Sequence, residues 1–178
     1  MPDHAGRRAF ALGGGFQFGD WLDPTAPPND AFQAKTDLNL VATSQFFRSV
    51  SVTAEAAGTL GKADDARRFR EIAERIRDAI LREYVTEGGA VVSVSQTAYA
   101  LAITLRLFRS DDWRSRMGDR LVEPLRNNGY RIGTGFVGTP IIADALTDTG
   151  RLDAVGHLLS QTENPSWLYQ VTLGATTT

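Results

Sequence analysis

Two short aromatic segments carry side chains suited to binding a sugar. Residues 20–23, Asp-Trp-Leu-Asp, lie in a Gly- and Pro-rich stretch, and residues 166–169, Ser-Trp-Leu-Tyr, follow Pro165. An indole face packs against the C–H groups of a sugar ring, while a carboxylate accepts hydrogen bonds from its hydroxyls. The same residue types also suit a buried Trp beside a turn capped by Asp, or aromatic packing beneath a loop. The sequence leaves both interpretations open for each segment.

Residues 133–138, Gly-Thr-Gly-Phe-Val-Gly, match the G-x-G-x-x-G spacing of a dinucleotide-binding loop. That fingerprint requires a buried strand directly before it. The preceding residues 127–132, Asn-Asn-Gly-Tyr-Arg-Ile, end a helix instead of forming a hydrophobic strand. We therefore interpret the glycines as positions where the backbone passes close to another part of the chain.

No other motif predicts a reaction within this sequence. His4 lies near the start of the chain, and His157 lies on a predicted helix where a packed or half-exposed ring is expected. The acidic pairs at residues 64–65 and 111–112 stand at helix starts, where they complement the helix dipole. The sequence has no cysteine and no metalloprotease, serine-hydrolase or P-loop motif. We expect no cofactor and no metal site.

Hydrophobic periodicity predicts an all-α fold of helices joined as antiparallel hairpins. Thr36 is the expected N-cap of the first helix, and Pro140 the first residue of the fifth. The helix over 96–108 is apolar on most sides and should be buried on more than one face. Phe16 and Phe18 are candidates for a short strand, as is the stretch 90–94. The six helices are predicted from 36 to 58 or 61, from 64, over 96–108, from 111 or 112 to 127, over 140–150 and over 152–162. In the last of these, Val155, Leu158 and Leu159 are expected to point inward.

The composition describes a globular chain. It has 178 residues with 42% hydrophobic and 22% charged side chains and a net charge of −2. The small charge predicts no nucleic-acid partner, and the longest apolar run is far shorter than the ~20 residues of a membrane span. No apolar stretch follows Arg7 and Arg8 as in a signal peptide, which favours a cytoplasmic location. We divide the chain into a loop-rich segment, 1–35, and a helical part, 36–178.

Five segments in this order and spacing resemble the six-hairpin catalytic domain of bacterial α-L-rhamnosidases, glycoside hydrolase family 78. They are residues 18–24 (Phe-Gly-Asp-Trp-Leu-Asp-Pro), 133–140 (Gly-Thr-Gly-Phe-Val-Gly-Thr-Pro), 146–148 (Leu-Thr-Asp), 165–169 (Pro-Ser-Trp-Leu-Tyr) and 174–177 (Gly-Ala-Thr-Thr). The resemblance covers about nine tenths of the chain. It implies an (α/α)6 barrel, of which this chain is about half, and inverting hydrolysis of terminal α-L-rhamnosides.

The resemblance also implies where substrate and catalysts lie. Asp20 and Trp21 match the rhamnose-binding region, and Phe136, Trp167 and Tyr169 match loops near the mouth of the barrel. Inversion needs two carboxylates roughly 6.5–9.5 Å apart. The family pattern implies a general acid upstream of Met1 and a general base just after Thr178. We therefore expect a fragment that belongs to an enzyme of rhamnose-containing glycosides and lacks both catalytic carboxylates. With its apolar faces uncovered, this fragment should be marginally stable or self-associate.

Two other functions remain open from the sequence. One is a six-hairpin glycosidase acting on a different deoxy-sugar or uronide, which a screen of aryl glycosides separates from the first. The other is a non-catalytic helical module that binds a sugar or a protein. Loss of a rhamnose-induced fluorescence change in Trp21→Ala would indicate a sugar site.

Overall fold

The computed structural model describes residues 15–176, and this part of the chain contains helices and no strands. The only pairing of extended residues there is a single antiparallel bridge between Val85 and Val91. The seven helices are α1 (Leu38–Thr59), α2 (Ala63–Tyr84), α3 (Gln96–Thr104), α4 (Asp111–Asn127), α5 (Ile142–Asp148), α6 (Leu152–Ser160) and α7 (Trp167–Thr172). The prediction of an all-α fold is confirmed.

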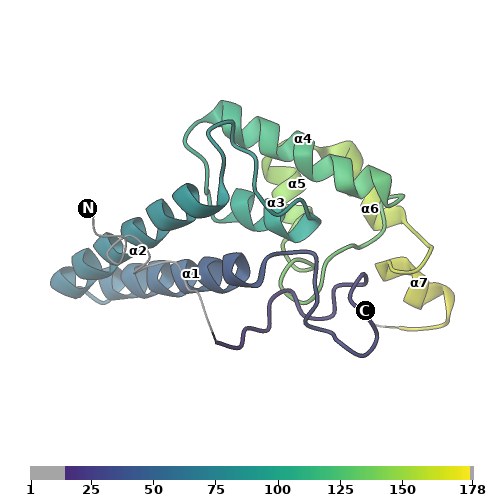
Figure 1. Cartoon of the computed structure of the whole chain (residues 1–178), viewed down its shortest axis with the longest axis horizontal. Helices are drawn as coiled ribbons and strands as arrows, with labels where there is room; N and C mark the ends of the chain where they lie inside the picture. The colour runs from purple at the N-terminus through teal and green to yellow at the C-terminus, as the bar shows by residue number, and fades with distance from the viewer. Residues whose placement is uncertain (1–14, 177–178) are drawn as a thin grey trace.

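The helices pack as three successive antiparallel hairpins followed by α7. Helix α1 packs on α2, α3 on α4 and α5 on α6, and α3 also contacts both α1 and α5. Figure 1 shows the α1–α2 hairpin projecting from the body formed by the later helices. None of the helices within 15–176 is long and apolar enough to cross a membrane.

Several predicted boundaries are wrong by a few residues. The N-cap of α1 is Asp37, whose Oδ1 accepts a 2.8 Å hydrogen bond from the amide of Leu40, whereas Thr36 is buried and pairs with the Ser95 hydroxyl at 2.7 Å. Helix α3 ends at Thr104 instead of continuing to residue 108, and Arg106 just beyond it has a φ of +53°. A residue in this left-handed region stops the helical turn.

The loop-rich segment is irregular where it is described. Residues 15–37 contain neither helix nor strand, so the strand suggested for Phe16 and Phe18 is not formed. Their rings instead pack edge-on at 4.9 Å. His4 and the other residues before 15 lie outside the described part, and the division at residue 35 stays a prediction.

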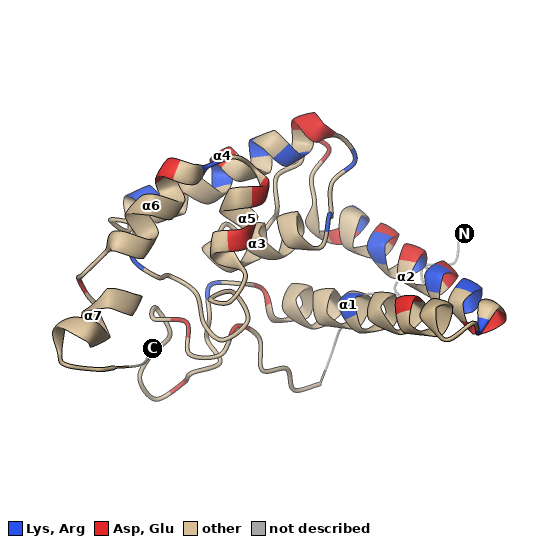
Figure 2. Ribbon diagram, turned by 180° about the vertical axis from the view of Figure 1, so that it is seen from behind, with Lys and Arg blue, Asp and Glu red and all other residues tan. Residues whose placement is uncertain are grey.

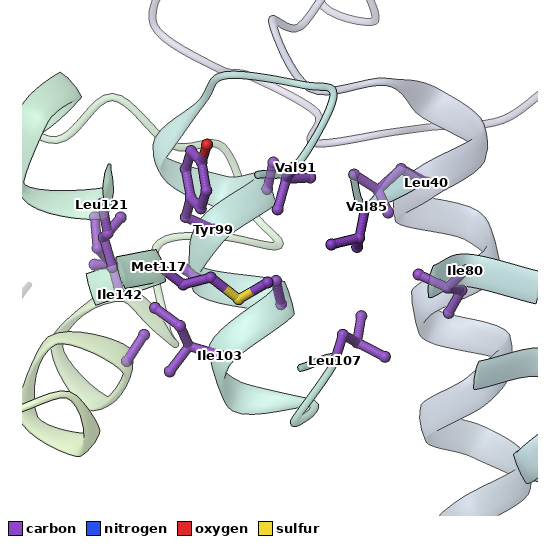
Figure 3. Close-up of a cluster of buried hydrophobic side chains, with 14 of the residues drawn as sticks. Leu40, Ile80, Val85, Val91, Tyr99, Ile103, Leu107, Met117, Leu121 and Ile142 are labelled. Atoms are coloured by element: carbon purple, nitrogen blue, oxygen red, sulfur yellow. The ribbon is translucent and has the colours of Figure 1, made fainter. Parts of the chain in front are cut away.

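A cluster of buried apolar side chains from successive hairpins forms the core (Figure 3). Eight of the nine residues of α3 are buried, which confirms that this helix is covered on several sides. Helix α2 contributes Ile76 and Ile80, both 0% exposed, while its opposite side carries the charged residues seen in Figure 2. That charged face is exposed to solvent, which is usual for a helix surface that carries charges of both signs.

Candidate functional site

Three loops meet at the N-terminal end of α3. They are the loop of residues 19–23, the glycine loop of residues 133–138, and the segment of residues 165–167 that leads into α7. The amide of Phe136 donates to the Trp21 carbonyl at 2.9 Å, and the amide of Ile132 donates to the Pro165 carbonyl at 2.9 Å. These backbone bonds join parts of the chain that are far apart in sequence.

The carboxylate of Asp20 lies at the centre of this junction and is 0% exposed. Its Oδ1 accepts from the amides of Val137 and Gly138, at 2.9 and 3.1 Å. Its Oδ2 accepts from the amide of Gly135 at 2.8 Å and from the Thr97 hydroxyl. Because both oxygens are fully occupied by protein donors, Asp20 holds the glycine loop in place and has no oxygen turned towards solvent.

The first turn of α3 supplies the second anchor of the glycine loop. The side-chain amide of Gln96 accepts from the Gly133 amide at 2.8 Å and donates to the Arg131 carbonyl at 3.2 Å. The cap of α3 fixes this turn, because the Ser95 hydroxyl accepts from the amide of Ala98 at 3.0 Å. Gln96 at the start of α3 therefore holds the first residue of the glycine loop, while Asp20 holds residues 135, 137 and 138.

Two glycines of the loop are required by close approach. A Cβ on Gly135 would overlap the backbone carbonyls of Asp20 and Trp21, and one on Gly138 would overlap the side chains of Thr97 and Thr134. The interpretation of the G-x-G-x-x-G segment as a site of close backbone contact is therefore confirmed. The tight contact brings Phe136 against Trp21.

Exposed aromatic rings form the surface of the junction. Trp21 is 39% exposed; its ring lies parallel to that of Phe32, with centroids 6.2 Å apart, and 5.7 Å from that of Phe136. Phe136 itself is 65% exposed. A Trp packed as core would be covered on all sides, so Trp21 is not a core residue of the described part, and its contact with a ligand stays a prediction.

A pocket of about 700 Å³ opens beside Phe136. The other aromatic ring in its wall is that of Trp167, and the remaining side chains are mostly apolar. Such a volume falls in the range of small-molecule sites. No Asp or Glu lines this pocket in the described part of the chain. The full lining is Leu22, Thr134, Gly135, Phe136, Thr139, Pro140, Ala143, Leu159 and Trp167.

Trp167 is placed by a short helix that the sequence analysis took for a loop. Ser166 is the N-cap of α7, and its hydroxyl accepts from the amide of Tyr169 at 3.1 Å. The aromatic run has no helical periodicity, so the Ser at the cap position was the available signal. Tyr169 is half-buried and lies outside the pocket lining.

The structure thus brings together part of the predicted set. Phe136 and Trp167 line one pocket, the Trp21 ring contacts that of Phe136, and the Asp20 carboxylate binds the loop that carries Phe136. Contact of any of these residues with a sugar stays a prediction.

Leu159 and Leu22 are among the pocket residues that were not predicted as site residues. Leu159 was predicted to point into the core, but it is 48% exposed and lines the pocket. Leu22 has a φ of +60°, an uncommon conformation for Leu that its place after Trp21 did not reveal.

The described residues also contain no group of three or more His, Cys, Asp or Glu side chains that could hold a metal ion. The site within 15–176 therefore consists of aromatic and aliphatic walls on a hydrogen-bonded frame. Such walls bind and orient a ligand with apolar faces.

Comparison with known proteins gives the class of this helical domain. Residues 5–178 match the family described as the bacterial alpha-L-rhamnosidase 6 hairpin glycosidase domain. The chain is 36% identical over 165 residues to an alpha-L-rhamnosidase of Alteromonas sp. (strain LOR), a match that covers 90% of this chain and 18% of that protein. An alpha-L-rhamnosidase of Streptomyces avermitilis is 36% identical over 160 residues, which cover 90% of this chain and 14% of that protein.

Solved structures give the same class. The native α-L-rhamnosidase of Aspergillus terreus matches with a TM-score of 0.88 and 35% identity, over 92% of this chain and 19% of that one. The Streptomyces avermitilis enzyme, solved in complex with L-rhamnose, matches with a TM-score of 0.78 and 36% identity, over 90% of this chain and 14% of that one. The fold is that of a six-hairpin glycosidase domain, of which 15–176 hold three hairpins.

The chain belongs to the bacterial α-L-rhamnosidase six-hairpin glycosidase domain family. It spans less than a fifth of the length of the relatives it matches.

Proposed function

We propose that this chain forms one wall of the rhamnose site in an α-L-rhamnosidase catalytic domain. The protein that contains it then hydrolyses terminal α-L-rhamnosides with inversion. The observation that carries the proposal is the hydrogen-bonded junction at Asp20, which holds Phe136, a residue of the apolar pocket, against Trp21. Membership of the family supplies the reaction class.

The walls suit rhamnose because this sugar is a 6-deoxyhexose. Its methyl group and C–H face can pack against aromatic rings, while its hydroxyls stay available to polar groups. Phe136, Trp167 and Leu22 offer such apolar contacts in one pocket. Asp20 acts as a positioning residue in this proposal, because its oxygens already accept hydrogen bonds from the glycine loop.

The two catalytic carboxylates come from other parts of the polypeptide. Inversion requires one carboxylic acid to protonate the leaving oxygen and one carboxylate to activate water. No acidic side chain within 15–176 lines the apolar pocket, and the chain matches less than a fifth of its relatives. A chain lacking both groups binds sugar without cleaving the glycosidic bond.

Fluorescence titration with L-rhamnose tests the binding part. We expect a saturable change that is lost in Trp21→Ala and kept in Trp113→Phe, since Trp113 lies outside the pocket and against the core. Thermal melting of each variant shows whether the fold is retained. A wild-type chain without any response, or a response that survives in Trp21→Ala, contradicts the proposed site.

Incubation with 4-nitrophenyl α-L-rhamnoside tests the catalytic part. The 178-residue chain should release no nitrophenol above the rate of buffer alone. Turnover at the ordinary rates of enzymes, about 1–1,000 per second, would show that the chain contains its own acid and base and would overturn this part of the proposal.

A further inference from the structure

Helix α7 carries Trp167, one aromatic wall of the apolar pocket, but it has little packing of its own. It consists of six residues, none of which is buried. Among the helices within 15–176 it packs only on α6, and Figures 1 and 2 show it at one end of the described structure. The place of Trp167 therefore depends in large part on residues 161–165, which join α6 to α7 and are called the connecting segment below.

Gln161 fastens the connecting segment at its first residue. It follows directly on α6, and its side-chain amide donates to the Gly129 carbonyl at 2.6 Å. The oxygen of the same side chain accepts from the Glu163 amide at 2.8 Å, which fixes the turn of the segment. Further along, the backbone bond from Ile132 to Pro165 continues the attachment. The connecting segment is therefore bonded to the residues that lead into the glycine loop.

Two side-chain contacts run beside these bonds. Arg131 forms an ion pair with Glu163, and the rings of Tyr130 and His157 lie 4.7 Å apart. The side chains of Arg131 and Glu163 are 33% and 65% exposed, so water screens their attraction. Among these side chains only that of Gln161 uses both a donor and an acceptor to tie the segment to itself and to the chain before the glycine loop.

We propose that Gln161 is a positioning residue of the apolar pocket. It holds the connecting segment in place and so keeps Trp167 at a set distance from Phe136 on the opposite wall. Gln161 lies outside the pocket lining, so it acts through Trp167 and touches no ligand. Its role in sugar binding rests on the proposed function, which places rhamnose in this pocket.

The width of the pocket matters because contact between apolar surfaces is short-ranged. A gap of about 0.5–1 Å already forfeits a quarter to a half of the dispersion attraction between two atoms. The two walls belong to different segments, and the bond from Gln161 to Gly129 joins residues 32 positions apart. Without that bond, the wall formed by Trp167 can move away from the sugar, and water can enter the gap.

Spin labels measure this movement without any sugar. The chain has no cysteine, so labels attach only where cysteine is introduced. Thr147→Cys on α5 and Val171→Cys on α7 are exposed positions outside the pocket lining, and α5 contributes Ala143 to that lining. Double electron–electron resonance in an excess of unlabelled chain reports distances within one molecule. We expect one narrow peak, and in Gln161→Ala a second peak at longer distance, because the freed segment can open locally.

Calorimetric titration with L-rhamnose measures the effect on binding. Gln161→Ala should bind rhamnose about three- to tenfold more weakly, which corresponds to the loss of one or two hydrogen bonds. Saturating rhamnose should return the labels of this variant to the single short-distance peak, because the sugar favours the closed pocket. Thermal melting shows that the variant is folded when both measurements are made.

A control and a second variant accompany Gln161→Ala. Gln170→Ala is the matched control, because Gln170 is an exposed glutamine of α7 outside the pocket lining. It should keep both the single peak and the affinity for rhamnose. Glu163→Ala removes the exposed ion pair and retains the fold, and it should give smaller changes in the same direction. If Gln161→Ala does not fold, Glu163→Ala decides the test.

The outcomes separate this proposal from the one on which it rests. An unchanged distance distribution in folded Gln161→Ala overturns the positioning role, whatever the affinity for rhamnose. Equal affinity of Gln161→Ala and the unaltered chain for rhamnose overturns it as well, as does an equal change in Gln170→Ala. An unaltered chain that does not bind rhamnose overturns the proposed function and the sugar-binding role of Gln161, while the distance measurement still decides whether Gln161 sets the width of the pocket.

Discussion

Replacing Asp20 with Asn tests whether its carboxylate holds the glycine loop. The amide has the same shape, but one acceptor oxygen becomes an NH₂ donor. At the Oδ1 position this donor would face the amides of Val137 and Gly138, and at Oδ2 it would face the Gly135 amide and the Thr97 hydroxyl. A hydroxyl can rotate to accept a bond, so the Oδ2 placement costs less.

The size of the effect follows from counting these bonds. One buried amide is left without an acceptor, at a cost of about 1–3 kcal/mol. Two further bonds pass from a charged to a neutral acceptor and lose about 1 kcal/mol each. A neutral amide is easier to bury than a carboxylate, which offsets part of this loss. We therefore expect Asp20→Asn to lower the free energy of unfolding by about 2–4 kcal/mol.

Asp23→Asn is the matched control for this measurement. Asp23 is also buried, at 3% exposure, but accepts only from Thr25 and the Lys35 amide in its own loop. Because Lys35 is exposed, water can accept from its amide in place of the lost oxygen, so the loss should be smaller than at Asp20, about 1–2 kcal/mol. Only Asp20→Asn should change the near-ultraviolet circular dichroism of Trp21, whose ring contacts that of Phe136. Equal losses in guanidinium unfolding, or an unchanged aromatic signal in Asp20→Asn, would refute the reasoning.

Three other predictions address the frame, the core and the surface. Gly135→Ala should destabilise the chain by about 1–3 kcal/mol and weaken rhamnose binding, since its Cβ overlaps backbone carbonyls that cannot rotate away; retained affinity would contradict this. Burial raises the pKa of Tyr99 above its ordinary value of 10.0, although the charge of Arg120 opposes this shift. Burial, and to a smaller extent the charge of Asp37, also raise the pKa of Tyr84 above 10.0. The protonated phenols therefore stabilise the fold fully below pH 10, and this stabilisation is lost as the pH rises through the folded pKa; urea unfolding at several alkaline pH values should show a slope that Tyr99→Phe reduces. The exposed apolar side chains predict self-association, so sedimentation velocity should show oligomers that grow with concentration, and a monomer at all concentrations would contradict it.

The sequence predicted burial correctly where the apolar spacing within a single helix was sufficient to do so. Ile76 and Ile80 recur at helical spacing on a strongly charged segment, and the structure buries both. The apolar stretch of α3 likewise predicted burial on several sides. In these helices the apolar spacing over a few turns already indicates which face packs against the core.

The role of Asp20 could not be read in the same way. A carboxylate beside a Trp in a loop suits both sugar binding and loop capping, and the deciding donors belong to residues 97 and 135–138. The prediction that Leu159 points into the core is wrong for a similar reason, because its helical spacing is compatible with a core position and with a pocket position. Such assignments depend on contacts between distant segments, which local patterns do not contain.

The junction around Asp20 also has a consequence for the order of folding. Its hydrogen bonds join residues separated by 77 to 118 positions, whereas the turn between α1 and α2 closes over a few residues. Closing so long a loop costs more entropy than forming a hairpin, so the helical hairpins can assemble first. During synthesis Trp21 therefore emerges long before residues 133–138, which pack against it, and the junction around Asp20 is among the last parts of the described structure to form.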